Sequence, residues 1–389
     1  MAETCKAAVW TDVRQVKTMQ VRMPECRDDG LIIKLEATSI CGTDLHLYNK
    51  RPEYPTIMGH ELCGSIVEMG KNAADSMRCY TGKVKVGDRI CIYPWVVCGT
   101  CENCITYGIG ACGICENSFV YGIPYEELGT GGHRIRTNSI NEEPFITGGY
   151  SEYMYVFPGT FMWQVPEEMP SRVASLLDPM AVAMRSVELA MREPGVFEDN
   201  LNVSSTVLVI GDGQIGTFVA MICRILGVKN IIISGHRDER LEIAKKISGA
   251  DETVNSKIQT KEEIKEVISH YTSRNGADVV FQCTGSPVAF RQGIDLLKNV
   301  GTLVECGNIV EGKKIDFDPA RDLCSKHATY IGMSVNKASS FNRAFQILLK
   351  HNQYPVEEIF THRATLDTVD TVLSQGKDMN YMKGWIDFL

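Results

Sequence analysis

Residues 206–216 read TVLVIGDGQIG, and this stretch decides the fold of the middle of the chain. Its apolar, mostly β-branched start predicts a buried strand, and the pattern Gly211-x-Gly213-x-x-Gly216 leads directly into a helix-length segment. The first glycine permits a tight turn, the second lets a pyrophosphate approach the backbone, and the third lets the helix pack on the strand. The helix N-terminus then offers free N–H groups to phosphates. The alternative is an incidental glycine-rich turn.

Apolar strands alternate with helix-length segments from about residue 179 to residue 340. Buried parallel strands joined by crossover helices produce this alternation. It predicts an α/β fold with a doubly wound parallel sheet of about six strands that binds a dinucleotide. The further predicted strands are 230–234, 277–283, 302–306 and 328–333.

The flanking parts of the chain have a different texture. Residues 1–178 contain short apolar runs broken by glycine and proline, which predicts a β-rich domain. The tail, 341–389, begins with a helical pattern at 341–351, and we expect more helix after Tyr354-Pro355. We therefore expect two domains in the 389 residues, with 179–340 as the dinucleotide-binding one.

Composition excludes several function classes. The 48 acidic and 40 basic residues give a net charge of -8, which argues against a nucleic-acid surface. The chain has no apolar run of about 18 residues for a membrane span, and its first residues lack the pattern of a secretory signal. We expect a cytoplasmic protein whose partner is a small molecule.

The end of the second predicted strand bears on the choice of cofactor. An NAD site usually has an acid about 20 residues beyond the glycine motif, but Gly235 stands about there, followed by His236 and Arg237. A guanidinium can pair with a 2′-phosphate, so we favour NADP over NAD and expect Gly235→Asp to shift the preference towards NAD. In the alternative, Arg237 is a solvated residue and NAD is used. The predicted cofactor contacts are Gly211, Asp212, Gly213, Gln214, Ile215, Gly216, Gly235, His236, Arg237 and Arg240.

A cluster of cysteines has the spacing of a metal site. Cys98, Cys101, Cys104 and Cys112 form C-x2-C-x2-C-x7-C, and four thiolates can surround one tetrahedral structural zinc. The spacing favours zinc over an iron–sulfur cluster or no metal at all. Cys115 is the alternative fourth ligand, although the x7 spacing favours Cys112.

Three segments far apart in the sequence suggest a second, reactive metal. A catalytic zinc takes three protein ligands and keeps one position open, and Cys41, His60 and Asp178 offer a thiolate, an imidazole and a carboxylate. Such an ion lowers the pKa of a bound oxygen by several units. Asp178 precedes Pro179, however, so it is equally suited to cap a helix.

These motifs together resemble the zinc-dependent medium-chain alcohol dehydrogenases. The set C-G-T-D-x-H (41–46), G-H-E (59–61), the four-cysteine lobe and the later glycine loop is most similar to the threonine, sorbitol and polyol dehydrogenase branch. The resemblance implies a GroES-like catalytic domain (1–178 and 341–389) with a Rossmann domain (179–340) between its parts. It also implies a homo-oligomer, a tetramer or a dimer.

The resemblance also implies roles at matching positions. Thr43 would hydrogen-bond the substrate oxygen, and His46 would pass its proton to solvent. Glu61 would lie beside the metal, as an exchanging ligand or behind the ligands. The branch commonly has Glu-Pro where this chain has Asp178-Pro179, so Glu61 is the alternative carboxylate ligand. Arg185 stands where a histidine is common, and we assign it no role.

The expected reaction is hydride transfer between a secondary alcohol and NAD(P), on a polyol, an amino alcohol or an anionic hydroxy compound. The last class is suggested by His133, Arg134 and Arg136 in a long insert, 120–149, although such bases are commonly just solvated. The competing functions are a zinc-free reductase of activated double bonds and a non-enzymatic nicotinamide sensor. Neither needs an open metal site with a proton relay.

Overall fold

The computed structural model describes residues 3–108, 113–124, 138–192, 200–273, 275–308 and 314–388, which form two compact units. Unit 1 comprises residues 1–178, 337–353 and 360–389, and unit 2 comprises 179–336 and 354–359. The division differs from the predicted boundaries at two short segments. Residues 337–340 join unit 1, and residues 354–359 join unit 2, where Lys246 Nζ lies 2.7 Å from Glu358 Oε1.

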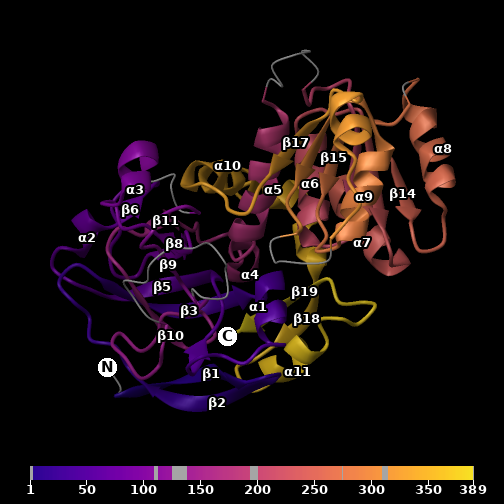
Figure 1. Cartoon of the computed structure of the whole chain (residues 1–389). Coiled ribbons are helices and arrows are strands. Elements are labelled where there is room, and N and C mark those ends of the chain that lie inside the picture. Colours follow the sequence, from indigo (N-terminus) through magenta and orange to yellow (C-terminus); the bar gives the residue numbers. More distant parts are fainter. Residues whose placement is uncertain are drawn as a thin grey trace. The chain divides into compact units, whose positions relative to one another are not determined.

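Unit 2 is built on a six-stranded sheet in which every neighbouring pair of strands is parallel (Figure 1). The first strand, β12, lies in the centre, and the strand order reverses beside it, as in a doubly wound dinucleotide-binding fold. In sheet order the strands are β14 (Glu252–Asn255), β13 (Asn230–Gly235), β12 (Thr206–Ile210), β15 (Ala277–Gln282), β16 (Leu297–Glu305) and β17 (Thr329–Gly332).

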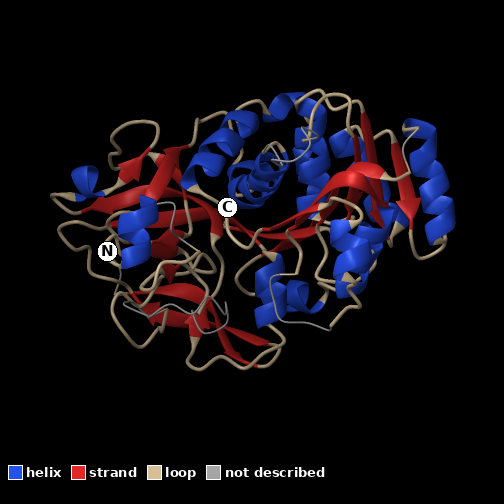
Figure 2. Ribbon diagram, turned by 45° about the horizontal axis from the view of Figure 1, so that its top comes forward, coloured by secondary structure: helices blue, strands red, loops and turns tan. Residues whose placement is uncertain are grey.

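Helices cover both faces of this sheet (Figure 2). α6 packs against α7, and α8 packs against α9, because the crossovers leave the central strand in opposite directions. Between the sheet and these helices lies a core of buried aliphatic side chains, including Leu208, Ile232 and Val280. The helices are α5 (Leu177–Ala190), α6 (Gln214–Ile225), α7 (Asp238–Ser248), α8 (Lys261–Tyr271) and α9 (Pro287–Leu296), with short helical turns η3 (Pro319–Cys324) and η5 (Val356–Ile359).

Unit 1 contains two larger sheets and a short hairpin-like pair. The main sheet has the order β18-β19-β3-β5-β7-β11-β6, and β10 also pairs with β3; a second sheet has the order β2-β1-β4. Its strands are β1 (Thr4–Asp12), β2 (Gln15–Arg22), β3 (Leu31–Ser39), β4 (Thr56–Ile57), β5 (Glu61–Met69), β6 (Arg78–Cys79), β7 (Arg89–Ile92), β8 (Trp95–Val96), β9 (Phe119–Val120), β10 (Tyr153–Val156), β11 (Phe161–Gln164), β18 (Phe360–Ala364) and β19 (Lys383–Asp387).

The tail of the chain corrects one prediction. Beyond α10 the expected further helix is mostly replaced by two strands, β18 and β19, with a single short helix between them. The cause is long-range pairing, because β19 runs antiparallel to β3 and supplies the sheet with a neighbour from the far end of the chain.

The helices of unit 1 are α1 (Gly42–Leu47), α2 (Ala73–Ser76), α3 (Glu102–Tyr107), α4 (Ser171–Ala174), α10 (Ala338–Leu348) and α11 (Val369–Ser374), with η4 (His351–Gln353). Among the described residues, no helix has the length and apolar character that crossing a membrane requires.

Candidate functional site

Unit 1 brings three predicted metal-binding side chains together. Cys41, His60 and Glu61 each place one ligand atom within 4.8 Å of the others. Cys41 directly precedes α1, and His60 directly precedes β5. The two residues therefore lie at the same end of the neighbouring strands β3 and β5. The sheet therefore assembles a thiol, an imidazole and a carboxylate from two segments 20 residues apart.

The Glu61 carboxylate is held from one side only. Its Oε2 accepts hydrogen bonds from Ser39 Oγ at 2.6 Å and from Lys383 Nζ, whereas its Oε1 is buried without a hydrogen-bond partner. The Glu61 and Lys383 side chains are each only 1% exposed. The strand register explains the contact between Lys383 and Glu61. Trp385, two residues after Lys383 in β19, lies opposite Ser39 of β3, and Ser39 lies opposite Glu61 of β5. Lys383 carries no motif, and sequence reasoning missed it.

A second carboxylate lies behind His60. Asp44 Oδ1 is 3.9 Å from His60 Nδ1, and Asp44 Oδ2 accepts from the Cys41 backbone N–H at 2.9 Å and from Tyr150 Oη–H at 2.8 Å. Gly59 makes room for this arrangement, because its φ is +93° and a Cβ there would lie 2.4 Å from the Tyr150 ring. Both Asp44 Oδ1 and His60 Nδ1 are buried without a hydrogen-bond partner.

The electrostatics of the cluster call for a cation. Burial, and then the nearby charges of Glu61 and Asp44, raise the pKa of the Cys41 thiol well above its usual value. Burial also raises the pKa of Asp44. A divalent ion would lower the pKa of the Cys41 thiol again and so favour its thiolate. It would also give the free Oε1 of Glu61 a partner. The donor set of sulfur, nitrogen and oxygen therefore fits zinc.

Asp178 is not part of this ligand group. It lies in the first turn of α5, close enough for its charge to raise the pKa of Cys41, but its carboxylate is not among the gathered ligand atoms. Glu61, the alternative that the sequence left open, takes that place. On the same helix, Arg185 Nη1 lies 3.6 Å from Glu188 Oε2. His133, Arg134 and Arg136 fall outside the described residues.

The two predicted proton-relay residues share one face of α1. Thr43 and His46 are three residues apart on this helix, so their side chains neighbour each other. Thr43 is half-buried and His46 is exposed. Partial burial, and then the charges of Lys50 and Lys377, lower the pKa of His46 below its ordinary value. The shift favours the neutral imidazole, the form that accepts a proton.

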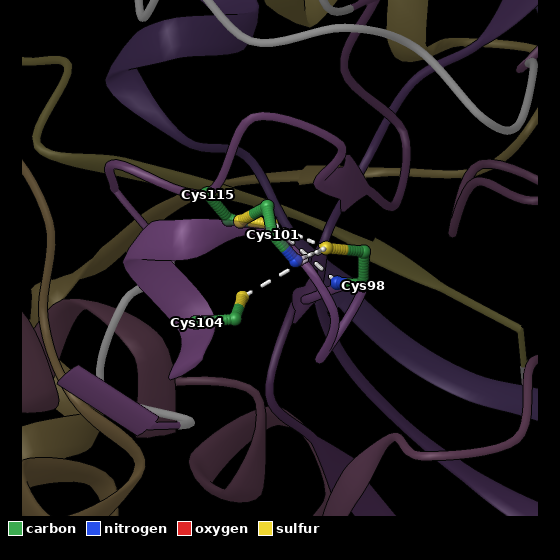
Figure 3. A group of neighbouring side chains, drawn as sticks. All are labelled: Cys98, Cys101, Cys104 and Cys115. Carbon is green, nitrogen blue, oxygen red and sulfur yellow. Dashed lines mark hydrogen bonds between the residues drawn. The ribbon is translucent and has the colours of Figure 1, made fainter. Parts of the chain in front are cut away.

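Four cysteines converge in a separate lobe of unit 1 (Figure 3). The sulfurs of Cys98, Cys101, Cys104 and Cys115 all lie within 4.8 Å of one another, with Sγ–Sγ distances of 3.6 Å for Cys98–Cys115 and 3.9 Å for Cys98–Cys104. A tetrahedron with Zn–S bonds of about 2.3 Å separates its sulfurs by about 3.8 Å. The spacing therefore fits a closed, four-coordinate structural zinc.

The pKa shifts within the lobe differ in direction, because burial raises the pKa of Cys104 and of Cys115 whereas the pKa of Cys98 is lowered. Burial opposes ionisation of Cys98, but the backbone N–H groups of Thr100 and Cys101 donate to its Sγ at 3.4 Å and lower its pKa to about 6. The sequence leaves Cys112 and Cys115 as the two candidates for the fourth ligand. Cys115 lies with the other three cysteines, whereas Cys112 falls outside the described residues.

The position of Cys115 beside the other three cysteines predicts a difference between two matched substitutions. We expect Cys115→Ser to remove one equivalent of zinc per chain, because a serine hydroxyl is a poor fourth ligand, and to lower the apparent melting temperature. Cys112→Ser serves as the control and should keep the full zinc content. Metal analysis by plasma mass spectrometry on both purified variants decides the matter; zinc lost from the Cys112 variant instead would assign the site to Cys112.

The glycine loop of unit 2 has the geometry that a dinucleotide requires. Gly211 has a φ of +134°, and at Gly216 a Cβ would lie 2.1 Å from the Gly211 carbonyl oxygen, so the helix approaches the strand closely. Gly213 caps α6, and a Cβ there would meet no described atom within 4 Å. The space above Gly213 is thus left for a ligand rather than for the chain.

The premise behind the cofactor prediction needs correction. The sequence shows no acid at the end of β13, yet the Asp212 carboxylate reaches that place from the glycine loop and accepts from the backbone N–H of His236 at 2.8 Å and of Arg237 at 3.1 Å. A Cβ on Gly235 would lie 2.5 Å from Asp212 Cβ and 2.7 Å from Oδ2. The expected Gly235→Asp conversion is therefore sterically blocked while Asp212 is present.

Comparison with known families matches most of the chain. Residues 27–167 match the sequence model described as "Alcohol dehydrogenase GroES-like domain", and residues 215–350 match the one described as "Zinc-binding dehydrogenase". These matches agree with the predicted pairing of a GroES-like and a Rossmann domain. Both families' names fit the metal-ligand groups and the glycine loop described above.

Curated relatives and solved structures extend over the same length. The chain is 27% identical to L-threonine 3-dehydrogenase from Bacillus velezensis, covering 90% of this chain and 88% of that protein, and 28% identical to that of Xanthomonas campestris, covering 94% and 95%. An alcohol dehydrogenase structure from Thermotoga maritima aligns with a TM-score of 0.84 and 25% identity, covering 99% and 100%. A zinc-binding dehydrogenase from Sinorhizobium meliloti bound to NADP aligns with 0.80 and 26%, also covering 99% and 100%.

Proposed function

The chain belongs to the zinc-dependent alcohol dehydrogenase family, in its threonine and polyol dehydrogenase-like branch, and on this premise we propose that it oxidises a polar secondary alcohol with NADP. That it is a zinc-dependent NAD(P) dehydrogenase follows from the family itself. The alcohol class, the preference for NADP and the role of each residue are our proposals. The observation that carries the catalytic role is the group of half-buried Cys41 with buried His60 and Glu61, in which one carboxylate oxygen has no hydrogen-bond partner.

Cys41, His60 and Glu61 are the proposed ligands of the catalytic zinc, and Cys98, Cys101, Cys104 and Cys115 those of the structural zinc. When bound, the catalytic ion supplies a Lewis acid that makes the substrate hydroxyl easier to deprotonate. The chain positions the ligands: the Asp44 carboxylate lies behind the His60 ring, while Ser39 and Lys383 hold one oxygen of Glu61 and leave the other free. Asp178 adds negative charge beside Cys41 without ligating.

The proton leaves along α1. Thr43 is placed to hydrogen-bond the substrate hydroxyl, and the exposed His46 on the same face passes the proton to solvent. A bound nicotinamide would accept hydride from the alcohol carbon, and the hydroxyl proton would pass through His46 to water.

His46 gives this route a pH signature. We expect His46→Gln to lower kcat about ten-fold at pH 7, because glutamine does not titrate and cannot accept the proton. The wild-type rate should fall as pH drops through a value below 6.5, since the pKa of His46 is lowered and its protonated form is inactive in the relay. A pH profile of kcat from 5 to 9, with and without added imidazole as a proton acceptor, measures this. An unchanged profile in the variant would remove His46 from the relay.

NADP is favoured by the charges around the end of β13. His236, Arg237 and Arg240 lie at or just beyond this strand end, and a guanidinium recognises a 2′-phosphate well. One of the similar structures was solved with NADP bound, which supports the same choice. The proposed contacts with the rest of the dinucleotide come from Gly211, Gly213 and the first turn of α6.

A substrate panel tests the proposed function. Purified enzyme is incubated with secondary polyols, with amino alcohols including L-threonine, and with anionic hydroxy compounds, each with NADP and with NAD, and reduced nicotinamide is read by its absorbance. We expect turnover with at least one polar secondary alcohol and a higher kcat/KM with NADP. Activity only with primary alkanols would overturn the proposed substrate class, and activity that survives complete zinc removal would overturn the mechanism.

A further inference from the structure

The glycine loop contains a carboxylate that the dinucleotide motif does not require. Asp212 occupies the variable position between Gly211 and Gly213, and its side chain is only 10% exposed. It bends towards the end of β13, where its Oδ2 accepts from two successive backbone N–H groups, those of His236 and Arg237. These contacts fasten the turn from β13 into α7 to the phosphate-binding loop.

The charge of this carboxylate is already balanced by the chain. Its Oδ1 lies 3.6 Å from Arg240 Nη1 in the first turn of α7, and the Arg240 side chain is 11% exposed. The two backbone donors stand at the N-terminal end of α7, where the helix dipole favours an anion. Asp212 is thus buried, and groups of the chain compensate its charge.

The groups on the outer side of this turn have the opposite character. His236 is exposed and Arg237 is half-buried, and Gly235 adds no side chain between them and the strand end. A Cβ at Gly235 would collide with Asp212, so an acid cannot stand at position 235 in the presence of Asp212. The Asp212 side chain thus excludes a ribose-binding acid at position 235. Its hydrogen bonds also order His236 and Arg237.

We infer that Asp212 is a positioning residue for NADP: it fixes the backbone of His236 and Arg237 and the guanidinium of Arg240 where this turn can receive the 2′-phosphate. The inference rests on the proposed function, because it assumes that unit 2 binds a nicotinamide dinucleotide. On this inference, the preference for NADP over NAD depends on Asp212 and Gly235 together, and not only on the residues that follow β13.

A competing possibility makes the opposite prediction. If the Asp212 carboxylate acted directly on the cofactor, it would repel a 2′-phosphate and accept a hydrogen bond from a ribose hydroxyl, which favours NAD. Removing the carboxylate would then improve NADP binding. The sign of the change caused by one substitution therefore separates positioning from direct recognition.

The test measures dissociation constants of NADP and NAD by titration calorimetry on the full-length zinc-loaded enzyme. Wild type should bind NADP more tightly than NAD. Asp212→Ala should weaken NADP at least about ten-fold, the worth of one charge-assisted hydrogen bond, and weaken NAD less than about three-fold. Asp212→Asn, which keeps an acceptor for the backbone but loses the charge facing Arg240, should fall between the two. Glu239→Gln, an exposed site on the same helix, is the charge-matched control and should leave the NADP-to-NAD ratio unchanged.

Three results would overturn the inference. The first is an equal loss of affinity for NADP and NAD in the Asp212 variants, which indicates a merely structural role. The second is a gain in NADP affinity when the carboxylate is removed. The third is a wild type that binds NAD more tightly than NADP. Asp212→Asn keeps the test decisive if Asp212→Ala does not fold. Failure of the proposed function looks different, because neither dinucleotide would then bind to wild type at all.

Discussion

His60→Ala is expected to lower kcat/KM by about a thousand-fold or more with any substrate that the wild type uses. His60 is the only nitrogen donor in the gathered ligand group, and Lewis-acid activation of a hydroxyl by a metal ion is worth several kcal/mol. The variant should also lose one equivalent of zinc per chain while binding NADP almost normally. Steady-state kinetics, metal analysis and calorimetry measure the three effects separately.

The matched control is His270→Ala, an exposed histidine on α8 of unit 2. It should keep both activity and zinc. Full activity or a full zinc content in the His60 variant would remove the metal from the proposed mechanism. Loss of NADP binding together with zinc would indicate a general folding defect instead.

Lys383→Met should produce the largest loss of stability among single substitutions at the site. The Glu61 and Lys383 side chains are each 1% exposed, and removing one partner of a buried ion pair costs about 3–5 kcal/mol because the other charge remains buried. We expect a clear drop in the apparent melting temperature, and a larger drop for zinc-stripped protein, in which nothing else compensates Glu61. Differential scanning calorimetry of both forms provides the measurement.

A double substitution isolates the pair. Combining Lys383→Met with Glu61→Gln removes both charges, so the double variant should recover much of the stability that the single variant loses. Lys350→Met, at an exposed position next to α10, is the control for loss of a lysine and should change the melting temperature little. A double variant as unstable as the single one would show that Lys383 acts by packing rather than by charge.

Local sequence was sufficient wherever the feature depends on neighbours along the chain. The strand TVLVI followed by the glycine loop and a helix was predicted because hydrophobic pattern and glycine conformation act over a few residues, and the parallel sheet of unit 2 follows from repeating that unit. Cys98, Cys101 and Cys104 were found for the same reason, since one short segment supplies all three.

Choices between competing partners needed more than local pattern. The x7 spacing favoured Cys112, which lies outside the described residues, and among the described cysteines Cys115 lies with the other three. Asp178 has the right chemistry for a ligand but is not among the gathered ligand atoms, whereas Glu61 is carried to Cys41 by the pairing of β3 with β5. Asp212 was predicted as a cofactor contact in the glycine loop, yet its side chain occupies the strand end at which the sequence shows no acid.

The amino-acid order alone was enough to establish the two domain types, the glycine loop and most of the metal donors, because each is encoded in a short run of residues. Three-dimensional folding alone decided that Lys383 lies beside Glu61, since β19 reaches β3 across more than 300 positions of chain and no local pattern encodes that pairing. Buried charges depend on their neighbours in space for compensation, and those neighbours come from whichever strands the sheet brings side by side.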